Sequence, residues 1–278
     1  MQQVRSKDGT TIAFDRSGKG PAVILVGGAL SDRAAARPLT ALLNKHFTVV
    51  AYDRRGRGDS GDTPPNAVER EVEDIGALIK AAGGSAFVYG HSSGGLLALE
   101  AAAAGLSIPR LAVYEPPYIL DAGRSQQVRD YMSQLAELVA TGEYGPAVEL
   151  FLTRVVMTPA DMVAQMRSTP IWGALAKMAP TLLNDLAIMY NAIRDPSLST
   201  RQWASISQPA LVMDGQLSPP WMRNAVQTVA AALPNTTYRT LAGQTHGADP
   251  ALVAPVLIGF FEGRLEAEPE LEVAIQGA

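Results

Sequence analysis

Residues 88–95 read Val88-Tyr89-Gly90-His91-Ser92-Ser93-Gly94-Gly95. The apolar run before this turn, 86–89, predicts a buried strand, and the small residues of 93–104 predict a helix. Between them, Gly90, Ser92 and Gly94 form the pattern G-x-S-x-G, which is typical of a sharp turn that exposes a serine hydroxyl. A side chain at either glycine would collide with the neighbouring strand or helix. We therefore expect Ser92 in a strained backbone conformation, at the positive end of a helix dipole.

The composition indicates a globular protein with a sizeable core. The chain has 278 residues, of which 47% are hydrophobic and 18% charged, which suits one large α/β domain. The net charge of −4 without a basic block argues against nucleic acid as the main partner. The chain has no cysteine, which excludes disulfides, thiolate metal sites and a cysteine nucleophile.

The sequence contains no membrane or targeting signal that we recognise. No apolar run approaches the roughly 18 residues of a membrane span. The first eight residues lack the apolar centre of a signal peptide. We expect a cytoplasmic protein without membrane contact, and a homodimer is compatible with the sequence.

Strand and helix signals alternate through the first part of the chain. A hairpin is predicted over 2–6 and 11–16, and strands over 23–26, 48–52 and 111–114. Helices are predicted over 33–44 and 67–82, in addition to the one after Ser92. This order predicts a doubly wound, mostly parallel sheet with helices on both faces.

The pattern changes after residue 118. Helical stretches are predicted near 126–141, 146–156, 159–167, 171–178 and 182–193. Six of the nine methionines fall here: Met132, Met157, Met162, Met166, Met178 and Met189. Most of them are expected in the helices' own core, but some of these soft side chains are expected to form an adaptable apolar pocket over Ser92.

The sheet pattern then resumes, with strands predicted over 210–213 and 237–241 and helices over 221–233 and 250–263. We therefore expect a core formed by 1–118 and 208–264, a helical cap over 119–207, and a mobile acidic tail over 265–278.

A glycine-rich loop follows the strand at 48–52. It contains G-x-G-x-x-G at Gly56, Gly58 and Gly61, a pattern found in dinucleotide-binding proteins. The dinucleotide motif must open directly into a helix that holds the pyrophosphate. Here Thr63-Pro64-Pro65 follows instead, so we reject this interpretation and predict no nucleotide cofactor.

A serine hydroxyl needs a base to become a good nucleophile. The chain has three histidines. His91 lies within the turn and is expected to point away from Ser92, and His46 precedes a strand at the far end of the sheet. His246 follows the last predicted strand, where the carboxyl ends of parallel strands converge, so His246 is the predicted base.

These features together resemble the α/β-hydrolase superfamily over nearly the whole chain. The matching segments are 23–29, 52–60, the turn at Ser92, and Gly243-Gln244-Thr245-His246. The resemblance implies an oxyanion hole formed by the amide of Ser93 and that of Gly28 or Ala29. Many relatives carry His-Gly at the first strand end, but this chain has Val26-Gly27, so that residue cannot orient the loop in the usual way.

The acid that supports the histidine departs from the common pattern. Many relatives place an aspartate where this chain has Ser218, and a hydroxyl cannot stabilise an imidazolium as a carboxylate does. Two substitutes are present: Glu115, which closes the strand 111–114, and Asp214, at the edge of the strand 210–213. Haloalkane dehalogenases and zearalenone-type lactonases place their acid where Glu115 lies, so Glu115 is preferred and Asp214 is the second choice.

The predicted function is hydrolysis of a carboxylic ester or lactone without cofactor or metal. Ser92 is the nucleophile, His246 the base and Glu115 the acid, and the substrate is small and apolar. Two alternatives remain open. One is a cofactor-free lyase or oxygenase on the same fold, and the other is a small-molecule binding protein with low turnover.

Overall fold

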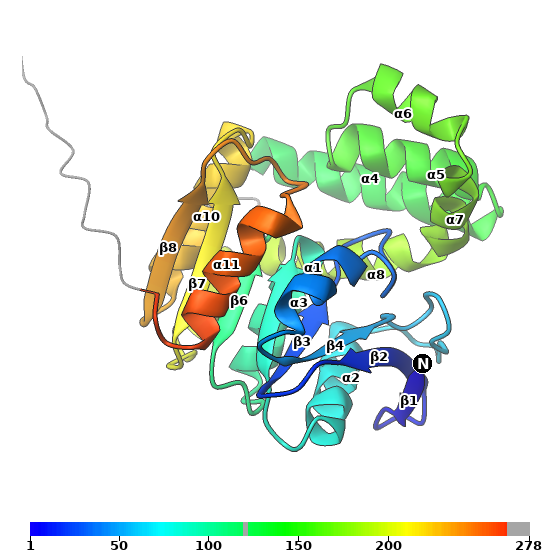
Figure 1. Ribbon diagram of the computed structural model, residues 1–278. Coiled ribbons are helices and arrows are strands. Elements are labelled where there is room, and N and C mark those ends of the chain that lie inside the picture. Colours follow the sequence, from blue (N-terminus) through cyan, green and yellow to red (C-terminus); the bar gives the residue numbers. More distant parts are fainter. Residues whose placement is uncertain (119–121, 266–278) are drawn as a thin grey trace, which may run out of the picture.

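The computed structural model describes residues 1–118 and 122–265, and its centre is an eight-stranded sheet (Figure 1). The strand order is β1-β2-β4-β3-β5-β6-β7-β8. The strands are β1 Gln2–Arg5, β2 Thr11–Ser17, β3 Ala22–Val26, β4 Thr48–Tyr52, β5 Phe87–His91, β6 Leu111–Tyr114, β7 Ala210–Gly215 and β8 Thr236–Leu241. Strand β2 pairs antiparallel with β1 and β4, and the other neighbours are parallel. The predicted mostly parallel sheet with an amino-terminal hairpin is therefore confirmed.

Helices cover both faces of the sheet, because successive side chains of a buried strand point to opposite faces. In β3, Ile24 and Val26 pack into the core shared with α2 (Val68–Ala81), α3 (Ser93–Ala103) and α10 (Pro220–Ala232). Val23 and Leu25 pack against α1 (Arg37–Leu43) and α11 (Pro250–Phe261). The continuous apolar run of this strand is explained by burial on both sides.

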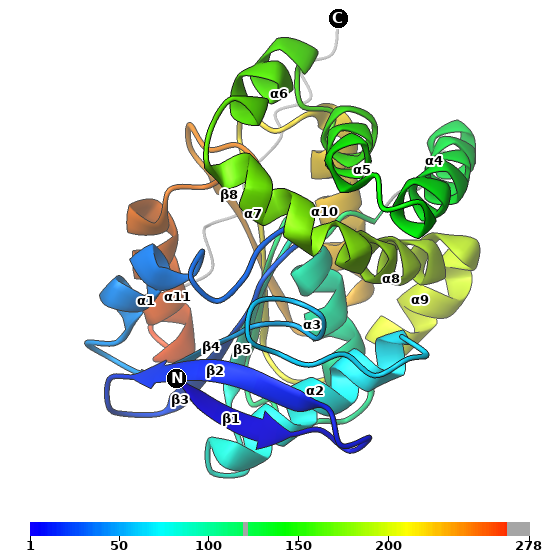
Figure 2. The same cartoon turned by 90° about the vertical axis from the view of Figure 1, so that its right-hand side faces the viewer.

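A run of helices lies between β6 and β7, as predicted. They are α4 Ala122–Ala140, α5 Tyr144–Leu150, the π-helical turn η1 Phe151–Val155, α6 Ala160–Arg167, α7 Ile171–Met178, the 3₁₀ turn η2 Ala179–Thr181, α8 Leu182–Arg194 and α9 Pro196–Trp203. We call residues 122–203 the helical segment. Figure 2 shows its first helices, α4 to α7, at the top of the molecule, and α8 and α9 lower down, beside α3.

The helical segment differs from the prediction in two places. The helix expected over 146–156 is divided, because α5 ends at Leu150 and continues as the π-helical turn. Helix α9 is not predicted from the sequence, since it is short and its residues, PSLSTRQW, are mostly polar. It begins where the Asp195 carboxylate accepts a hydrogen bond from the Leu198 amide, at 3.0 Å.

Two further predictions concern the carboxyl-terminal tail and membrane spans. The tail expected over 265–278 lies outside the described residues, apart from Leu265. Among the helices that the structure describes, none has the length and apolar character needed to cross a bilayer.

Candidate active site

The turn after β5 has the geometry that its glycines predict. Ser92 adopts φ 56° and ψ −129°, a conformation that costs free energy for a residue with a side chain. A Cβ atom at Gly90 would overlap the backbone of Gly94 and Gly95, and one at Gly94 would overlap the carbonyl oxygens of Val26 and Gly27. The two glycines therefore let the turn pack directly against β3 and lift Ser92 above the sheet.

His246 lies beside this serine. It belongs to the loop between β8 and α11, and its Nε2 is 3.1 Å from the Oγ of Ser92. On the other side of the ring, Nδ1 is 2.7 Å from Oε2 of Glu115. With the proton on Nδ1, the ring donates to Glu115 and accepts from the Ser92 hydroxyl. The fold thus joins three residues that lie far apart in the chain.

Glu115 is held in place by its backbone and by a second hydrogen bond. It follows β6 directly with φ 45°, in the left-handed region, and is fully buried. Its Oε1 accepts from the Gly215 amide at 2.8 Å. Burial by itself raises the pKa of this carboxyl, but the hydrogen bonds from His246 and Gly215 and the nearby Ser218 hydroxyl bring the pKa below its usual value. Glu115 is therefore a carboxylate that can stabilise an imidazolium.

The second candidate acid, Asp214, has other partners. It lies within β7 and is also fully buried. Its Oδ2 accepts from Nε of Arg223 at 3.0 Å and from the Tyr238 hydroxyl at 2.8 Å. The structure thus pairs His246 with Glu115, and it pairs Asp214 with residues of α10 and β8.

The amides expected to bind an oxyanion lie next to Ser92. Ser93 begins α3, and Gly28 is so close that an added Cβ would be 2.9 Å from the Cβ of Ser92. Within the described residues, the amides of Gly28, Ala29 and Ser93 donate to no backbone acceptor. They are therefore available to a developing negative charge at the top of the turn.

Two cavities meet at Ser92 and His246, with volumes of about 60 and 390 Å³. Both are bounded by Phe151 and Val156 of the helical segment. The smaller one continues past Glu115, and the larger one extends along the loop after β3. Their walls are mostly apolar: Pro117, Val155, Met189, Trp221 and Met222 on one side, and Leu30, Leu152, Met166 and Leu175 on the other. Two of the six methionines noted in the sequence, Met166 and Met189, thus line the cavities, whereas Met157 and Met162 are exposed.

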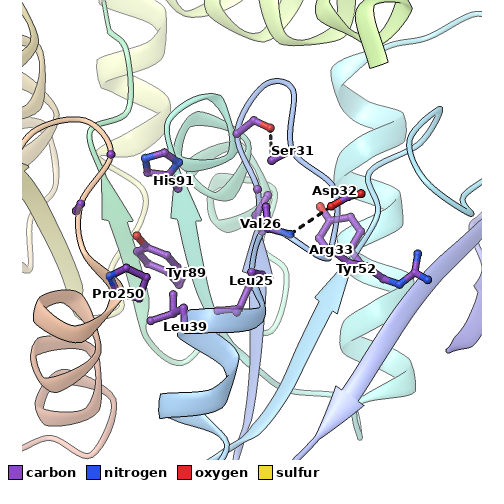
Figure 3. Close-up of a pocket in the computed structure, with 16 residues that line it drawn as sticks. Leu25, Val26, Ser31, Asp32, Arg33, Leu39, Tyr52, Tyr89, His91 and Pro250 are labelled. Atoms are coloured by element: carbon purple, nitrogen blue, oxygen red, sulfur yellow. Dashed lines mark hydrogen bonds between the residues drawn. The ribbon is translucent and has the colours of Figure 1, made fainter. Parts of the chain in front are cut away.

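A further cavity of about 180 Å³ lies behind the loop after β3 (Figure 3). Figure 3 shows His91, Tyr89, Leu39 and Leu25 around it. Nε2 of His91 donates to the carbonyl of His246 at 2.9 Å, and the two rings lie 4.9 Å apart. Burial and the neighbouring His246 lower the pKa of His91 to about 4, so this ring is neutral near pH 7. His91 thus supports the loop that carries His246, a contact that the sequence did not indicate.

No metal site emerges in the part of the chain described. Among those residues, no group of three or more His, Cys, Asp or Glu side chains could hold a metal ion. The glycine-rich loop after β4 instead directs its arginines into the protein. Arg54, Arg55 and Arg57 are all buried, and each is paired with a carboxylate.

Sequence reasoning missed the buried charges beside the turn. Asp185 of α8 is fully buried and binds Arg54, Arg57 and the hydroxyl of Ser93. The available signal was the density of arginines in a glycine loop, together with one aspartate on an apolar helix. Neither identifies its partner without the fold.

The comparisons with known proteins agree with this architecture. Residues 23–256 match the family described as "Alpha/beta hydrolase family". The crystal structure of an alpha/beta hydrolase from Sphaerobacter thermophilus is 55% identical, with a TM-score of 0.87, and the match covers 94% of this chain and 100% of that one.

Two curated relatives are hydrolases. A 2-(acetamidomethylene)succinate hydrolase from Mesorhizobium japonicum is 32% identical over 75% of this chain and 81% of the relative. A pimeloyl-[acyl-carrier protein] methyl ester esterase from Xanthomonas campestris is 27% identical over 84% of this chain and 90% of the relative. With the family match spanning most of the sheet and the whole helical segment, the chain belongs to the alpha/beta hydrolase family.

Proposed function

We propose that this protein is a serine hydrolase that cleaves a carboxylic ester or lactone through an acyl-enzyme intermediate. One observation carries the proposal: Ser92, His246 and Glu115 form a hydrogen-bonded triad. The distance is 3.1 Å from Ser92 Oγ to His246 Nε2, and 2.7 Å from His246 Nδ1 to Glu115 Oε2. A triad of this kind activates a hydroxyl, because the base is within reach of the proton and the carboxylate orients the base.

Each residue has one task in the reaction. Oγ of Ser92 attacks the substrate carbonyl carbon while its proton passes to Nε2 of His246. The carbonyl oxygen becomes an oxyanion and is bound by the amides of Ser93 and of Gly28 or Ala29. When the tetrahedral intermediate collapses, the leaving oxygen takes the proton from His246. A water molecule then repeats the sequence on the acyl-enzyme, again with His246 as base, and Ser92 is released.

The walls of the two cavities support a neutral, apolar substrate. None of the residues that line them is lysine or arginine, in the part of the chain described. The relative from Mesorhizobium japonicum is named for a succinate, whose two carboxylates call for cationic partners. We therefore do not extend that substrate to this chain. The substrates that we favour are neutral esters and lactones with apolar groups on both sides of the carbonyl.

The test is turnover of neutral p-nitrophenyl esters and of lactones by the wild type and by Ser92→Ala. We expect hydrolysis by the wild type and loss of nearly all of it in the variant. Ser205→Ala, a matched change at an exposed serine, should leave the rate unchanged. Full activity in Ser92→Ala would overturn the assignment of the nucleophile.

Covalent labelling separates this proposal from its alternatives. A fluorophosphonate reacts with an activated serine, so we expect a mass increase on Ser92 that disappears in His246→Ala. A lyase or oxygenase that uses Ser92 for positioning, or a binding protein, need not label there. Absence of labelling together with absence of ester turnover would reject the hydrolase proposal.

A further inference from the structure

The loop after β3 carries the amides of Gly28 and Ala29, which form one half of the proposed oxyanion hole. The loop begins after Val26, whose side chain is apolar and buried and therefore cannot hydrogen-bond to the loop. Two arginines from the glycine-rich loop contact its backbone instead. Nη1 of Arg54 donates to the Gly27 carbonyl at 3.3 Å, and Nη1 of Arg57 donates to the Gly28 carbonyl at 2.6 Å.

These contacts fix the direction of the amides. A peptide unit is planar, with its C=O and N–H pointing to opposite sides. Arg54 holds the carbonyl of the 27–28 peptide, so it also sets where the Gly28 amide points. Arg57 does the same for the 28–29 peptide and the Ala29 amide, together with the Ser31 hydroxyl, which donates to the same Gly28 carbonyl at 2.7 Å. Arg57 also donates to the carbonyl of Ser31 at 3.2 Å, which ties down the end of the loop.

The other half of the oxyanion hole is tied to the same buried carboxylate. Oδ1 of Asp185 accepts from Nη1 of Arg54 at 2.6 Å and from the Ser93 hydroxyl at 2.7 Å. Its Oδ2 accepts from Nη2 of Arg57 at 2.6 Å. Asp185 thus reaches both the residue whose amide follows Ser92 and the arginines that hold the opposite loop.

The charges of this cluster balance. Arg54 also binds Glu71 of α2 at 2.6 and 2.8 Å, so two buried arginines face two buried carboxylates. Burial raises the pKa of Asp185, but Arg54, Arg57 and the Ser93 hydroxyl bring it below its usual value. The carboxylate comes from α8 of the helical segment, whereas every group that it binds belongs to the α/β core.

We propose that Arg57 and Asp185 are a positioning pair that aims the oxyanion-binding amides, and that this alignment depends on α8 being seated on the core. The inference rests on the proposed function, because it assigns a cause to the geometry of that same site. Neither residue lines the two cavities at Ser92. Their effect is on the transition state, where the negative charge develops, and it should be small on the ground-state complex.

The experiment compares two buried ion pairs whose arginines come from the same loop after β4. Arg57→Lys keeps the charge but cannot reach two carbonyls and Asp185 together. Asp185→Asn keeps the shape but removes the negative charge, and Ser93→Ala is the mildest change because it removes one hydroxyl. The matched controls are Arg55→Lys and Asp74→Asn. Arg55 and Asp74 are equally buried and 2.7 Å apart, but they do not contact the loop after β3.

The readouts are kcat and KM for a p-nitrophenyl ester and the inhibition constant of an alkyl trifluoromethyl ketone, measured well below each variant's melting temperature. Loss of one oxyanion donor costs about 100-fold to 1,000-fold in kcat. For misdirected amides we expect kcat to fall about 10-fold to 100-fold in Arg57→Lys and Asp185→Asn, and several-fold in Ser93→Ala. KM should change little, and binding of the ketone should weaken by the same factor as kcat/KM. The controls should melt earlier but keep kcat and ketone affinity within about threefold.

The possible results separate the two proposals. If the wild type does not hydrolyse esters, the proposed function fails. If the wild type is active but Arg57→Lys and Ser93→Ala lose no more kcat than the Arg55 and Asp74 controls, the positioning pair is overturned. It is also overturned if KM rises and ketone affinity does not fall, because the pair would then act on substrate binding. Ser93→Ala changes no charge, so the comparison holds even where Asp185→Asn does not fold.

Discussion

Two buried acids lie side by side at the carboxyl ends of β6 and β7, yet they have different partners. Strands β6 and β7 are parallel neighbours with Tyr114 opposite Met213, which brings Glu115 and Asp214 level with each other. Both side chains are fully buried. Glu115 binds His246, whereas Asp214 binds Arg223 and Tyr238.

The difference comes from the backbone and from the neighbouring elements. Glu115 has left the strand in a left-handed conformation, which few residues with side chains adopt. Asp214 remains within β7, where α10 and β8 supply a guanidinium and a phenol. A place at the carboxyl edge of a parallel sheet therefore makes an acid a candidate, but the local chain direction and the available counter-charges decide what it does.

Glu115→Gln is the strongest test of this contrast. The amide keeps the shape of the side chain but cannot stabilise an imidazolium, and it can favour the wrong tautomer of His246. We expect kcat for a p-nitrophenyl ester to fall about 1,000-fold to 10,000-fold. A loss of kcat below tenfold in a folded variant would remove Glu115 from the proposed triad.

A second substitution in the same background sharpens the comparison. Ser218 is buried and lies near the Glu115 carboxyl, at the position where the resemblance to other α/β-hydrolases predicts an aspartate. We expect Glu115→Gln with Ser218→Asp to regain about tenfold to 100-fold of the lost rate, since a carboxylate returns behind His246. The Glu115→Gln, Ser218→Asn variant is the control, and an equal gain there would mean that charge is not the cause.

Asp214→Asn should act on stability and leave the chemistry nearly intact. The change weakens the bonds to Arg223 and Tyr238 in a buried place and is expected to cost about 1–3 kcal/mol of unfolding free energy. Urea denaturation measures this cost. The kcat of the folded variant should stay within about threefold of the wild type, and a loss comparable with that of Glu115→Gln would transfer the acid's role to Asp214.

His91→Gln is the smallest expected effect and concerns pH. The ring is held neutral with its pKa lowered to about 4, whereas the unfolded chain protonates near the ordinary value of 6.5. Between these values the unfolded state binds more protons, so stability falls as pH decreases from about 6.5 toward 4. Gln can donate to the His246 carbonyl but does not titrate. The melting temperature of His91→Gln should therefore fall less steeply with decreasing pH than that of the wild type. Parallel curves of melting temperature against pH would contradict the role of His91.

Much of the core can be predicted because its signals are local. The strands at 48–52 and 111–114 have the same bounds in the prediction and in the structure, since buried parallel strands are short apolar runs that end in turn residues. Helix α9 is missed because a short polar helix depends on its cap and its packing. The resemblance to zearalenone-type lactonases stays a prediction, as do the domain boundaries and the homodimer.

The sequence by itself determined the sharp turn at Ser92, the alternation that makes a parallel sheet, and the shortlist of His246, Glu115 and Asp214. These follow from steric limits, strand periodicity and side-chain chemistry, all of which act over a few residues. Only the tertiary structure decided which acid meets the histidine and which carboxylate meets Arg54 and Arg57. The pairs of Glu115 with His246 and of Arg54 with Asp185 each join positions 131 apart, and no local rule can favour one pairing over another. They depend on how far each backbone turns at the end of its strand and on which charges the packed helices bring into the low-dielectric interior.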